Sequence, residues 1–440
     1  MAAGGTVTDR RRPKAALFMV GCLAAGMAPH WLPPALRLVP AFSLAFLLGL
    51  YALRTVILQA FRDPAPAPAV ADPASLPAVD VVVAARDEQA VIGRLVERLL
   101  ALRYPADRLN LWFIDDGSED RTGPLLDELA QRHAQLRVIH RPRDAGGGKS
   151  GALNTVLPQL QGRWMLVLDA DADLQPEALE RAVRHAEAGD YGALQLRKAV
   201  VNGDHNLLTQ AQAMEMALDA VIQGGRLAHG GVAELRGNGQ LLRREAVHSS
   251  GGFNEATVTD DLDLSFRLLI HGHSIGLLWN PPVEEEAVLT LAALWRQRQR
   301  WAEGGLQRFF DYTSDFFSSQ VSGAQRLDLL CFFLLQYVLP VMAIADLFGA
   351  LITVTSPTIW PFSIVAFGLS GVSILAGCQR QSEGPELPAM NPFSLALGIV
   401  YLGHWFVVIP WTGLRMALLP KRLVWAKTLH LGDPQVAPPA

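Results

Sequence analysis

Apolar residues gather in three long windows of the chain, residues 15–60, 327–378 and 393–418. Each window is long enough to cross the roughly 30 Å hydrocarbon layer of a bilayer, which takes about 20 helical residues. Between the first two windows, residues 79–320 mix apolar and polar positions as a globular domain does. We therefore expect a membrane hairpin over 1–61, one large domain over 79–320 and further membrane helices over 327–420.

Within the large domain, short apolar runs alternate with segments of helical periodicity. Buried strands are predicted at 79–84, 111–114, 136–140 and 164–168, and amphipathic helices lie between and after them, the last over 176–188. Repeated units of this kind form a mostly parallel sheet with helices on both faces, so the predicted fold class is α/β. In such sheets, ligands bind beyond the carboxyl ends of the strands.

The membrane part is expected to contain four to five spans. The windows after residue 320 accommodate three spans with a break near Pro357, and the N-terminal hairpin adds two. Five spans put the basic residues of 421–427 on the side opposite to the N-terminus, against the positive-inside rule. With four spans, the segment that contains Gln336, Pro340 and Asp346 is re-entrant or lies in the interface.

Two further segments are expected to have no packed core. Residues 62–78 contain five prolines in a background of alanine, a composition that favours a semi-rigid linker. The last residues, 432–440, are expected to form a flexible tail.

Composition and charge limit the class of protein. Half of the residues are hydrophobic and only 18% are charged, against roughly a quarter in soluble domains, which excludes a wholly soluble enzyme. The net charge of −4 offers no basic excess for nucleic acid. Basic residues at 10–14 precede the first apolar stretch, so the N-terminus and the large domain are expected in the cytoplasm. The three cysteines lie far apart in apolar windows, which excludes a cysteine metal site.

Acidic residues follow three of the predicted strands. Asp87 comes after the first strand and Asp116 after the second, and Asp169 and Asp171 follow the fourth. Each alone is equally well explained as a cap of the next helix. Carboxylates that converge at one sheet edge repel each other unless a cation joins them, and hard oxygen ligands suit Mg²⁺ or Mn²⁺. Because these ions bind substrate phosphates, the pattern points to a nucleotide diphosphate.

Two predicted helix starts carry further candidates. Lys149 follows Gly146–Gly148, but Arg143 stands where the Walker phosphate loop requires glycine, so that motif is rejected. The glycines form either a flexible loop or a passage that lets Lys149 meet a phosphate. Asp261 follows Thr259 at the start of another helix, where it is either part of an N-cap or a general base for an acceptor hydroxyl.

The segment Leu291–Phe310 reads as a basic amphipathic helix at the bilayer surface. Its basic and aromatic residues are Trp295, Arg296, Arg298, Arg300, Trp301 and Arg308. A helix at this point of the chain can also bring Arg300 to a departing diphosphate and Trp301 to an acceptor that the membrane supplies.

These motifs together resemble the membrane-integrated family 2 glycosyltransferases, the group that contains cellulose, chitin and hyaluronan synthases. The resemblance lies in Asp115-Asp116-Gly117-Ser118, Lys149 with Ala152-Leu153-Asn154, Asp169-Ala170-Asp171, Thr259-Asp260-Asp261 and Gln297-Arg298-Gln299-Arg300-Trp301. Five motifs in family order over about 220 residues are specific together. Asp260 departs from the family pattern, since many members have glutamate there.

A narrower resemblance, from the linker to about Tyr312, is to the cyanobacterial-type β-monoglucosyldiacylglycerol synthases, which use UDP-glucose. It is carried by Gly147-Gly148-Lys149-Ser150-Gly151-Ala152-Leu153-Asn154, Glu234-Leu235-Arg236-Gly237-Asn238-Gly239-Gln240, Thr259-Asp260-Asp261-Leu262-Asp263-Leu264 and Arg300-Trp301-Ala302-Glu303-Gly304-Gly305. The membrane segments match less closely.

The resemblance implies a GT-A-like sheet and a role for each matched residue. UDP-glucose would contact Asp87, Asp116, Lys149, Asp169, Gln297 and Arg300. Mg²⁺ or Mn²⁺ would bind Asp169 and Asp171, Asp261 would be the catalytic base, and Trp301 would line the acceptor site. One direct displacement on α-linked UDP-glucose then gives a β-glucoside.

The expected function is transfer of glucose from UDP-glucose to 1,2-diacylglycerol by a multi-pass protein of the plasma or thylakoid membrane. Two alternatives stay open. A processive polysaccharide synthase, for example of a β-linked N-acetylglucosamine polymer, shares every general motif. A membrane scaffold that binds a nucleotide sugar without turnover also fits the residues. No protein partner is indicated.

Overall fold

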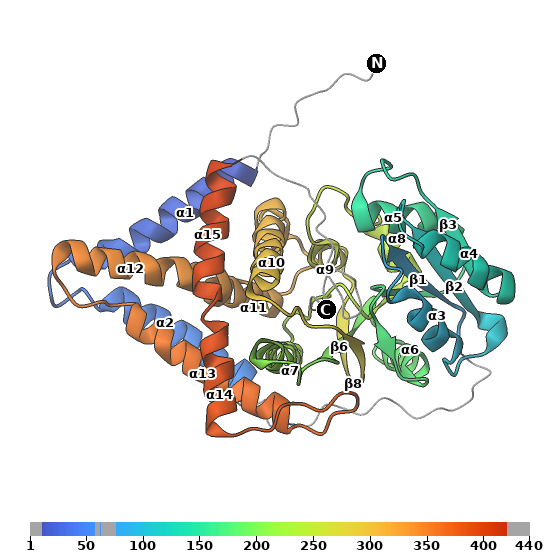
Figure 1. The fold of residues 1–440 in the computed structure, drawn as a ribbon. Helices are drawn as coiled ribbons and strands as arrows, with labels where there is room; N and C mark the ends of the chain where they lie inside the picture. Colours follow the sequence, from blue (N-terminus) through green and yellow to red (C-terminus); the bar gives the residue numbers. More distant parts are fainter. Residues whose placement is uncertain (1–10, 58–61, 63–75, 420–440) are drawn as a thin grey trace, which may run out of the picture.

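The computed structural model describes residues 11–57, 62 and 76–419. The expectations for Arg10, for most of the linker, for the basic residues of 421–427 and for the tail at 432–440 lie outside the described residues. A sheet domain and a group of long apolar helices lie on opposite sides of the molecule, and α7 (Leu207–Leu227) and α10 (Leu291–Asp311) lie between them (Figure 1).

Eight strands form one mixed sheet, in the order β3-β2-β1-β4-β7-β6-β8-β5. The strands are β1 (Val79–Ala85), β2 (Leu109–Asp115), β3 (Leu136–His140), β4 (Trp164–Leu168), β5 (Asp173–Leu174), β6 (Ala193–Val200), β7 (Gln240–Arg243) and β8 (Ile275–Glu285). β1 pairs in parallel with β2 and β4, and β2 with β3, whereas β7 is antiparallel to both neighbours. The predicted α/β fold with a mostly parallel sheet is confirmed, and all four predicted strands form.

Alternate residues of a strand point to opposite faces of the sheet. Because the strands are apolar on both faces, helices cover both. Val81 and Val83 of β1 belong to one apolar core, and Val82 belongs to the other. The first core includes residues of α3 (Ile92–Leu100), α4 (Thr122–Arg132) and α6 (Ala178–Ala188), and the second includes residues of α5 (Gly148–Val156), α8 (Arg244–Ser249) and α9 (Asp260–Ile270). The carboxyl ends of β1, β2 and β4 are left open at one edge.

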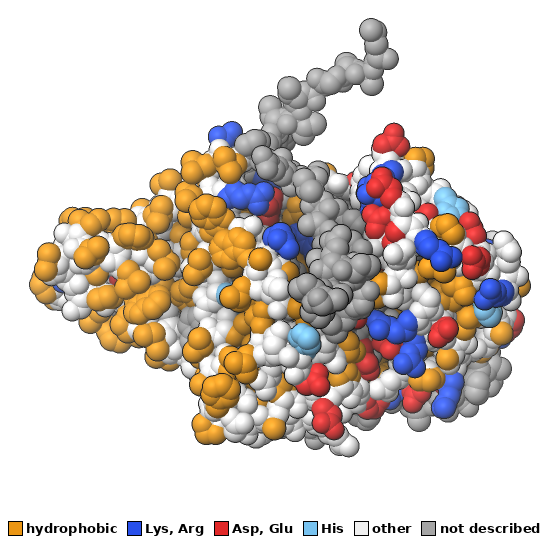
Figure 2. Space-filling view, viewed as in Figure 1, with side chains coloured by type: hydrophobic (Ala, Val, Ile, Leu, Met, Phe, Trp, Pro, Cys, Tyr) orange, Lys and Arg blue, Asp and Glu red, His pale blue; other side chains and the backbone are white. Residues whose placement is uncertain are grey.

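The apolar part is built from α1 (Arg11–Met27), α2 (Val39–Ala52), α11 (Gly323–Phe333), α12 (Leu339–Thr353), α13 (Trp360–Gln379), α14 (Pro392–Leu402) and α15 (Trp405–Leu418). Within the described residues, four helical segments are long and apolar enough to cross a membrane: Val39–Ile57, Gly323–Thr353, Trp360–Gln379 and Pro392–Leu418. Hydrophobic side chains cover this half of the surface, whereas charged side chains gather on the sheet domain (Figure 2).

Two expectations for the membrane part can be compared with the structure. The helix α12 ends at Thr353 and α13 begins at Trp360, so the predicted break near Pro357 is confirmed. Gly323–Thr353 continues as one helical segment of 31 residues through a π-helical turn at Leu334–Val338. The re-entrant alternative is wrong, because the segment is one continuous helix, and the interfacial alternative stays a prediction.

A buried group of charges joins the domain to the membrane helices. We call it the Glu234 network; its members are Arg226, Glu234, Arg236, Arg308 and Asp328. Glu234 pairs with Arg308 of α10 at 2.9 Å and with Arg236 at 3.1 Å. Arg226 of α7 lies 3.7 Å from Glu234 and pairs with Asp328 of α11 at 2.9 Å. The network therefore holds α7, α10 and α11 against the loop that precedes β7.

Candidate active site

The ends of β1 and β2 carry Asp87 and Asp116. The Oδ1 atom of Asp87 accepts a hydrogen bond of 2.7 Å from the backbone N–H of Glu119. Arg143 forms an ion pair with Asp87 at 3.2 Å, and Arg141 forms one with Asp116. Burial raises the pKa of Asp116, although the charge of Arg141 opposes this. The two predicted aspartates therefore lie on neighbouring strand ends, each beside an arginine.

Lys149 lies further along the same edge. It follows Gly146–Gly148, whose φ angles of 74°, 71° and 52° lie in the left-handed region that favours glycine. Its Nζ donates hydrogen bonds to Asp169 Oδ1 at 2.6 Å and to the carbonyl oxygen of Gly237 at 2.9 Å. Burial works against the charged amine, but the charge of Asp169 and of two further aspartates outweighs it and raises the pKa of Lys149. Lys149 is therefore a cation at the edge of the sheet.

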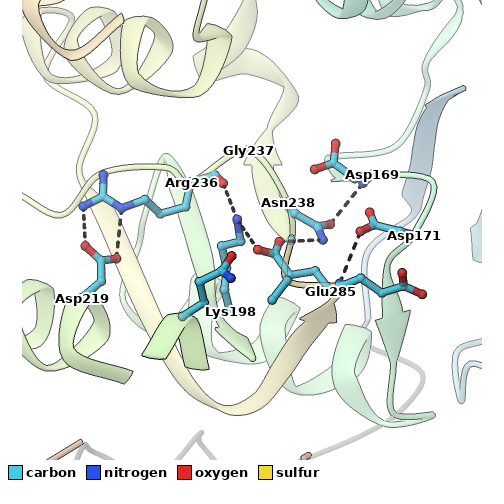
Figure 3. Close-up of polar contacts among 12 residues, drawn as sticks. Asp169, Asp171, Lys198, Asp219, Arg236, Gly237, Asn238 and Glu285 are labelled. Atoms are coloured by element: carbon cyan, nitrogen blue, oxygen red, sulfur yellow. Dashed lines mark hydrogen bonds and ion pairs between the residues drawn. The ribbon is translucent and has the colours of Figure 1, made fainter. Parts of the chain in front are cut away.

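Asp169 and Asp171 follow β4, as predicted, and lie beside Asn238 and Glu285 (Figure 3). The backbone N–H of Asp169 donates to the side-chain oxygen of Asn238 at 3.1 Å. Asp171 Oδ2 accepts a hydrogen bond of 3.4 Å from the backbone N–H of Glu286. Burial works against the charged carboxylate of Asp169, but the charge of Lys149 outweighs it and lowers the pKa.

Asp169 and Asp171 can supply only part of the ligand set of a metal ion. In the part of the chain that the structure describes, no group of three or more His, Cys, Asp or Glu side chains is arranged to hold a metal ion. Mg²⁺ in phosphate-transfer sites binds one or two protein carboxylates and takes its other oxygens from substrate phosphates and water. Asp169 and Asp171 match that donor set, so they suit a cation that binds together with a diphosphate.

Asp261 lies in the first turn of α9, beside Gly237, whose carbonyl oxygen accepts the hydrogen bond from Lys149. A Cβ atom built on Gly237 would lie 3.3 Å from Asp261 Oδ2, so the glycine backbone runs directly past the carboxylate. Burial, followed by the negative charge of Asp260, raises the pKa of Asp261 to about 6. A carboxylate with this pKa is ionised near neutral pH and accepts a proton more readily than an ordinary aspartate.

The helix α10 brings the remaining predicted residues to the site. Arg300 lies on this helix, and its charge is among those that lower the pKa of Asp169. Trp301 lies between two cations, with Arg298 Cζ 4.0 Å and Lys198 Nζ 5.6 Å from the ring centroid. Gln297 accepts a hydrogen bond of 2.7 Å from its neighbour Arg298.

Close packing fixes α10 against α9. At Gly304 a Cβ atom would overlap the side chain of Thr259, the residue before α9, and at Gly305 it would overlap the hydroxyl of Tyr337. The two glycines therefore let α10 touch both the start of α9 and the membrane helix beyond it. The position of Asp261 depends on this contact.

A cavity of about 390 Å³ runs from the membrane helices to Asp261 and Trp301. Most of its lining is apolar and comes from α2, α7, α11, α12, α13 and α15, for example Leu48, Ile222, Leu335, Leu339, Leu369 and Phe406. Its polar end is formed by Lys198, Asp219, Arg236, Asp261 and Arg308. An apolar molecule with a hydroxyl group at one end matches this distribution.

Several residues of the site were not predicted. Arg141 and Arg143 lie in a loop that matches no motif of the family. Asn238 belongs to the segment 234–240, which carries the narrower resemblance, but that resemblance implies no role for it. Lys198 and Glu285 lie in or at the end of predominantly buried strands. A charged residue within a buried strand is itself a signal, because charge is seldom buried without a partner.

Comparison with known proteins decides the family. The model of "Glycosyltransferase like family 2" matches residues 77–304. The chain belongs to family 2 of the glycosyltransferases. The match covers the whole sheet and extends into α10, so the residues predicted from the sequence to form the site lie inside the matched region, whereas Arg308 and most of the cavity lining lie outside it.

Relatives extend the similarity to most of the chain. The family 2 chain is 43% identical over 431 residues to the beta-monoglucosyldiacylglycerol synthase of Synechocystis sp., covering 96% of this chain and 89% of that one. It is 44% identical to the protein of the same name from Trichormus variabilis, covering 82% and 78%. These matches confirm the predicted family and the narrower resemblance.

A solved structure shares the fold. The mannosyltransferase PcManGT from Pyrobaculum calidifontis, in complex with GDP-Man and Mn²⁺, superposes with a TM-score of 0.57 at 19% identity. The similarity covers 91% of this chain and 99% of that one, so it includes the membrane part as well as the sheet.

We predict that Asp260→Asn moves the acid limb of the pH–rate profile to lower pH. In the native protein, activity should fall as the pH drops through about 6, because protonated Asp261 accepts no proton. Removing the Asp260 charge lowers the pKa of Asp261, by about half to one unit. The measurement is the initial rate between pH 5 and 8, with the exposed Asp107→Asn as the control. An unchanged limb in Asp260→Asn would contradict the coupling.

Gly304→Ala should lower the transfer rate at least about tenfold, because the new methyl group displaces α10 from α9 and moves Asp261. The melting temperature should also fall, by the equivalent of about 1–3 kcal/mol. Gly93→Ala on α3 is the matched control, since nothing lies within 4 Å of a Cβ atom there. Rates and melting curves in detergent measure both effects. Equal behaviour of the two variants would show that the contact is unimportant.

Proposed function

We propose that the protein transfers glucose from UDP-glucose to 1,2-diacylglycerol and forms β-monoglucosyldiacylglycerol and UDP. The observation that carries this proposal is the cavity that leads from the apolar helices to Asp261. A lipid acceptor must reach the base from the bilayer, whereas the nucleotide sugar reaches the sheet edge from water. The relatives named above, at 43% and 44% identity, are beta-monoglucosyldiacylglycerol synthases, which supports the same reaction here.

The donor is proposed to bind along the open edge of the sheet. Asp87 and Asp116 would hold the uridine part, and Lys149 would lie near the nucleotide. Asp169 would contact the ribose and diphosphate. Arg300 and Gln297 of α10 would close over the diphosphate. The proximity of Asp169, Lys149 and Arg300 supports this order.

Asp261 is proposed to remove the proton from the acceptor hydroxyl. The acceptor oxygen then forms a bond to the anomeric carbon while the bond from that carbon to the diphosphate oxygen breaks, and UDP leaves. Lys149 and Arg300 stabilise the negative charge that grows on the leaving group. One displacement inverts the anomeric carbon, so α-linked glucose becomes a β-glucoside. The pKa of Asp261, about 6, supports its role as base.

A divalent cation, Mg²⁺ or Mn²⁺, is proposed to bind the carboxylates of Asp169 and Asp171. When bound, the ion would neutralise charge on the diphosphate. Trp301, at the polar end of the cavity, would line the path of the acceptor.

The sheet domain is proposed to face the cytoplasm. Arg11, Arg12 and Lys14 lie at the start of α1, which precedes the first candidate span, and basic residues near membrane segments favour the cytoplasmic side. Leu291 and Trp295 at the start of α10 are exposed apolar side chains, as expected of a helix that lies on the bilayer surface.

The decisive experiment incubates membranes that contain the protein with labelled UDP-glucose and diacylglycerol. The expected result is one chloroform-soluble labelled lipid. Asp261→Asn should reduce its formation at least about a hundredfold, because the base is lost, while UDP affinity stays within about twofold. An ethanol-insoluble labelled polymer without labelled lipid would instead establish a polysaccharide synthase. Full function of Asp261→Asn in cells would indicate a binding protein without turnover.

Asp171→Ala should abolish the stimulation of UDP-glucose binding by Mg²⁺, because a ligand of the ion is lost. The expected loss is at least about tenfold in affinity at saturating Mg²⁺, with little change in EDTA. Asp173→Ala is the matched control, since Asp173 pairs with Arg98 at 3.1 Å instead. Calorimetry of both variants measures the effect. Unchanged Mg²⁺ dependence in Asp171→Ala would remove it from the ligand set.

A further inference from the structure

A second ion pair borders the candidate active site and has no role in the scheme above. Lys198 of β6 and Glu285 at the end of β8 pair at 2.7 Å, and their side chains are 10% and 15% exposed. Lys198 Nζ also lies 3.4 Å from the carbonyl oxygen of Arg236, and Glu285 Oε2 lies 3.4 Å from the side-chain nitrogen of Asn238 (Figure 3).

The pair lies where the sugar of the donor has to be. The diphosphate is assigned to Asp169 and Asp171, and the base is Asp261, so the hexose must lie between these groups. Lys198 is close to both the diphosphate-binding aspartates and the base. Its charge lowers the pKa of Asp169, and it lines the same cavity as Asp261. Its ammonium is also 5.6 Å from the ring centroid of Trp301.

The pair has hydrogen-bonding capacity left for a ligand. An ammonium has three N–H donors, and in the described part of the chain Glu285 and the Arg236 carbonyl account for two of them. Each carboxylate oxygen of Glu285 accepts more than one hydrogen bond. A donor and an acceptor side by side match two neighbouring hydroxyl groups of a sugar ring. A buried ion pair also adds little net stability, so folding alone gives weak reason for it.

We propose that Lys198 and Glu285 form the subsite that recognises the hydroxyl groups of the transferred hexose. The proposal deepens the proposed function and rests on it for the position of the donor. An epimer directs one hydroxyl group away from the pair and leaves a buried polar group without its partner. Sites built to hydrogen-bond a substrate hydroxyl discriminate strongly for this reason. The subsite therefore selects among UDP-hexoses, a choice that the general motifs do not make.

The test measures binding of UDP-glucose, UDP-galactose and UDP to the full-length protein by calorimetry, in native form and as Lys198→Met. The variant should bind UDP-glucose at least about tenfold more weakly, because a charged hydrogen bond is lost. UDP affinity should stay within about twofold, which also shows that the variant folds. The ratio of the affinities for UDP-glucose and UDP-galactose should move towards one. Glu285→Gln, a smaller change, should act in the same direction, and Lys198→Arg should restore part of the affinity.

The matched control is Arg184→Met. Arg184 of α6 pairs with Glu180 at 2.6 Å, with side chains that are 10% and 24% exposed, and takes no part in the site. It should leave all three affinities unchanged. A parallel loss of UDP and UDP-glucose affinity in Lys198→Met, or equal weakening of both UDP-hexoses, would overturn the proposal and indicate a structural pair. Because the readout is binding, its failure is distinct from absence of labelled lipid in the transfer assay, which would refute the proposed function.

Discussion

The Glu234 network is the interaction on which the rest of the structure depends. Burial alone would raise the pKa of Glu234, but the charges of Arg308 and Arg226 lower it to about 2, so the carboxylate stays ionised. Removing one partner from a buried pair leaves an uncompensated charge and costs about 3–5 kcal/mol. The network therefore ties α7, α10 and α11 to the loop that contains Gly237. That loop in turn contacts both Lys149 and Asp261 through Gly237.

This attachment brings the polar edge of the sheet and the apolar cavity together at the carboxylate of Asp261. The sheet edge is polar and open to water, whereas the cavity behind α10 is lined mostly by apolar side chains from the membrane helices. The close contacts of Gly304 with Thr259 and of Gly305 with Tyr337 also hold the two regions together. In the proposed reaction, the nucleotide sugar would approach Asp261 from the sheet edge and the lipid from the apolar cavity.

Electrostatics within the site separates the roles of its acidic residues. Asp169 is paired with Lys149, which keeps it ionised and suited to bind a cation or a phosphate-bound metal. Asp261 lies beside Asp260 and is half-buried, and loss of solvent together with the charge of Asp260 raises its pKa, which suits it to accept a proton. The two aspartates therefore differ in pKa because their neighbours differ, and each is suited to a different role.

The sequence by itself determined the alternation of strands and helices, the apolar windows and the motif residues, because periodicity and turn chemistry are local properties. Asp87, Asp116, Asp169 and Asp261 were predicted in this way. The tertiary structure alone decided that Lys198 and Glu285 form an ion pair, that Gly304 contacts Thr259 beside α9, and that a cavity reaches Asp261. These features join residues far apart in the chain, and no local pattern encodes which of them pack together.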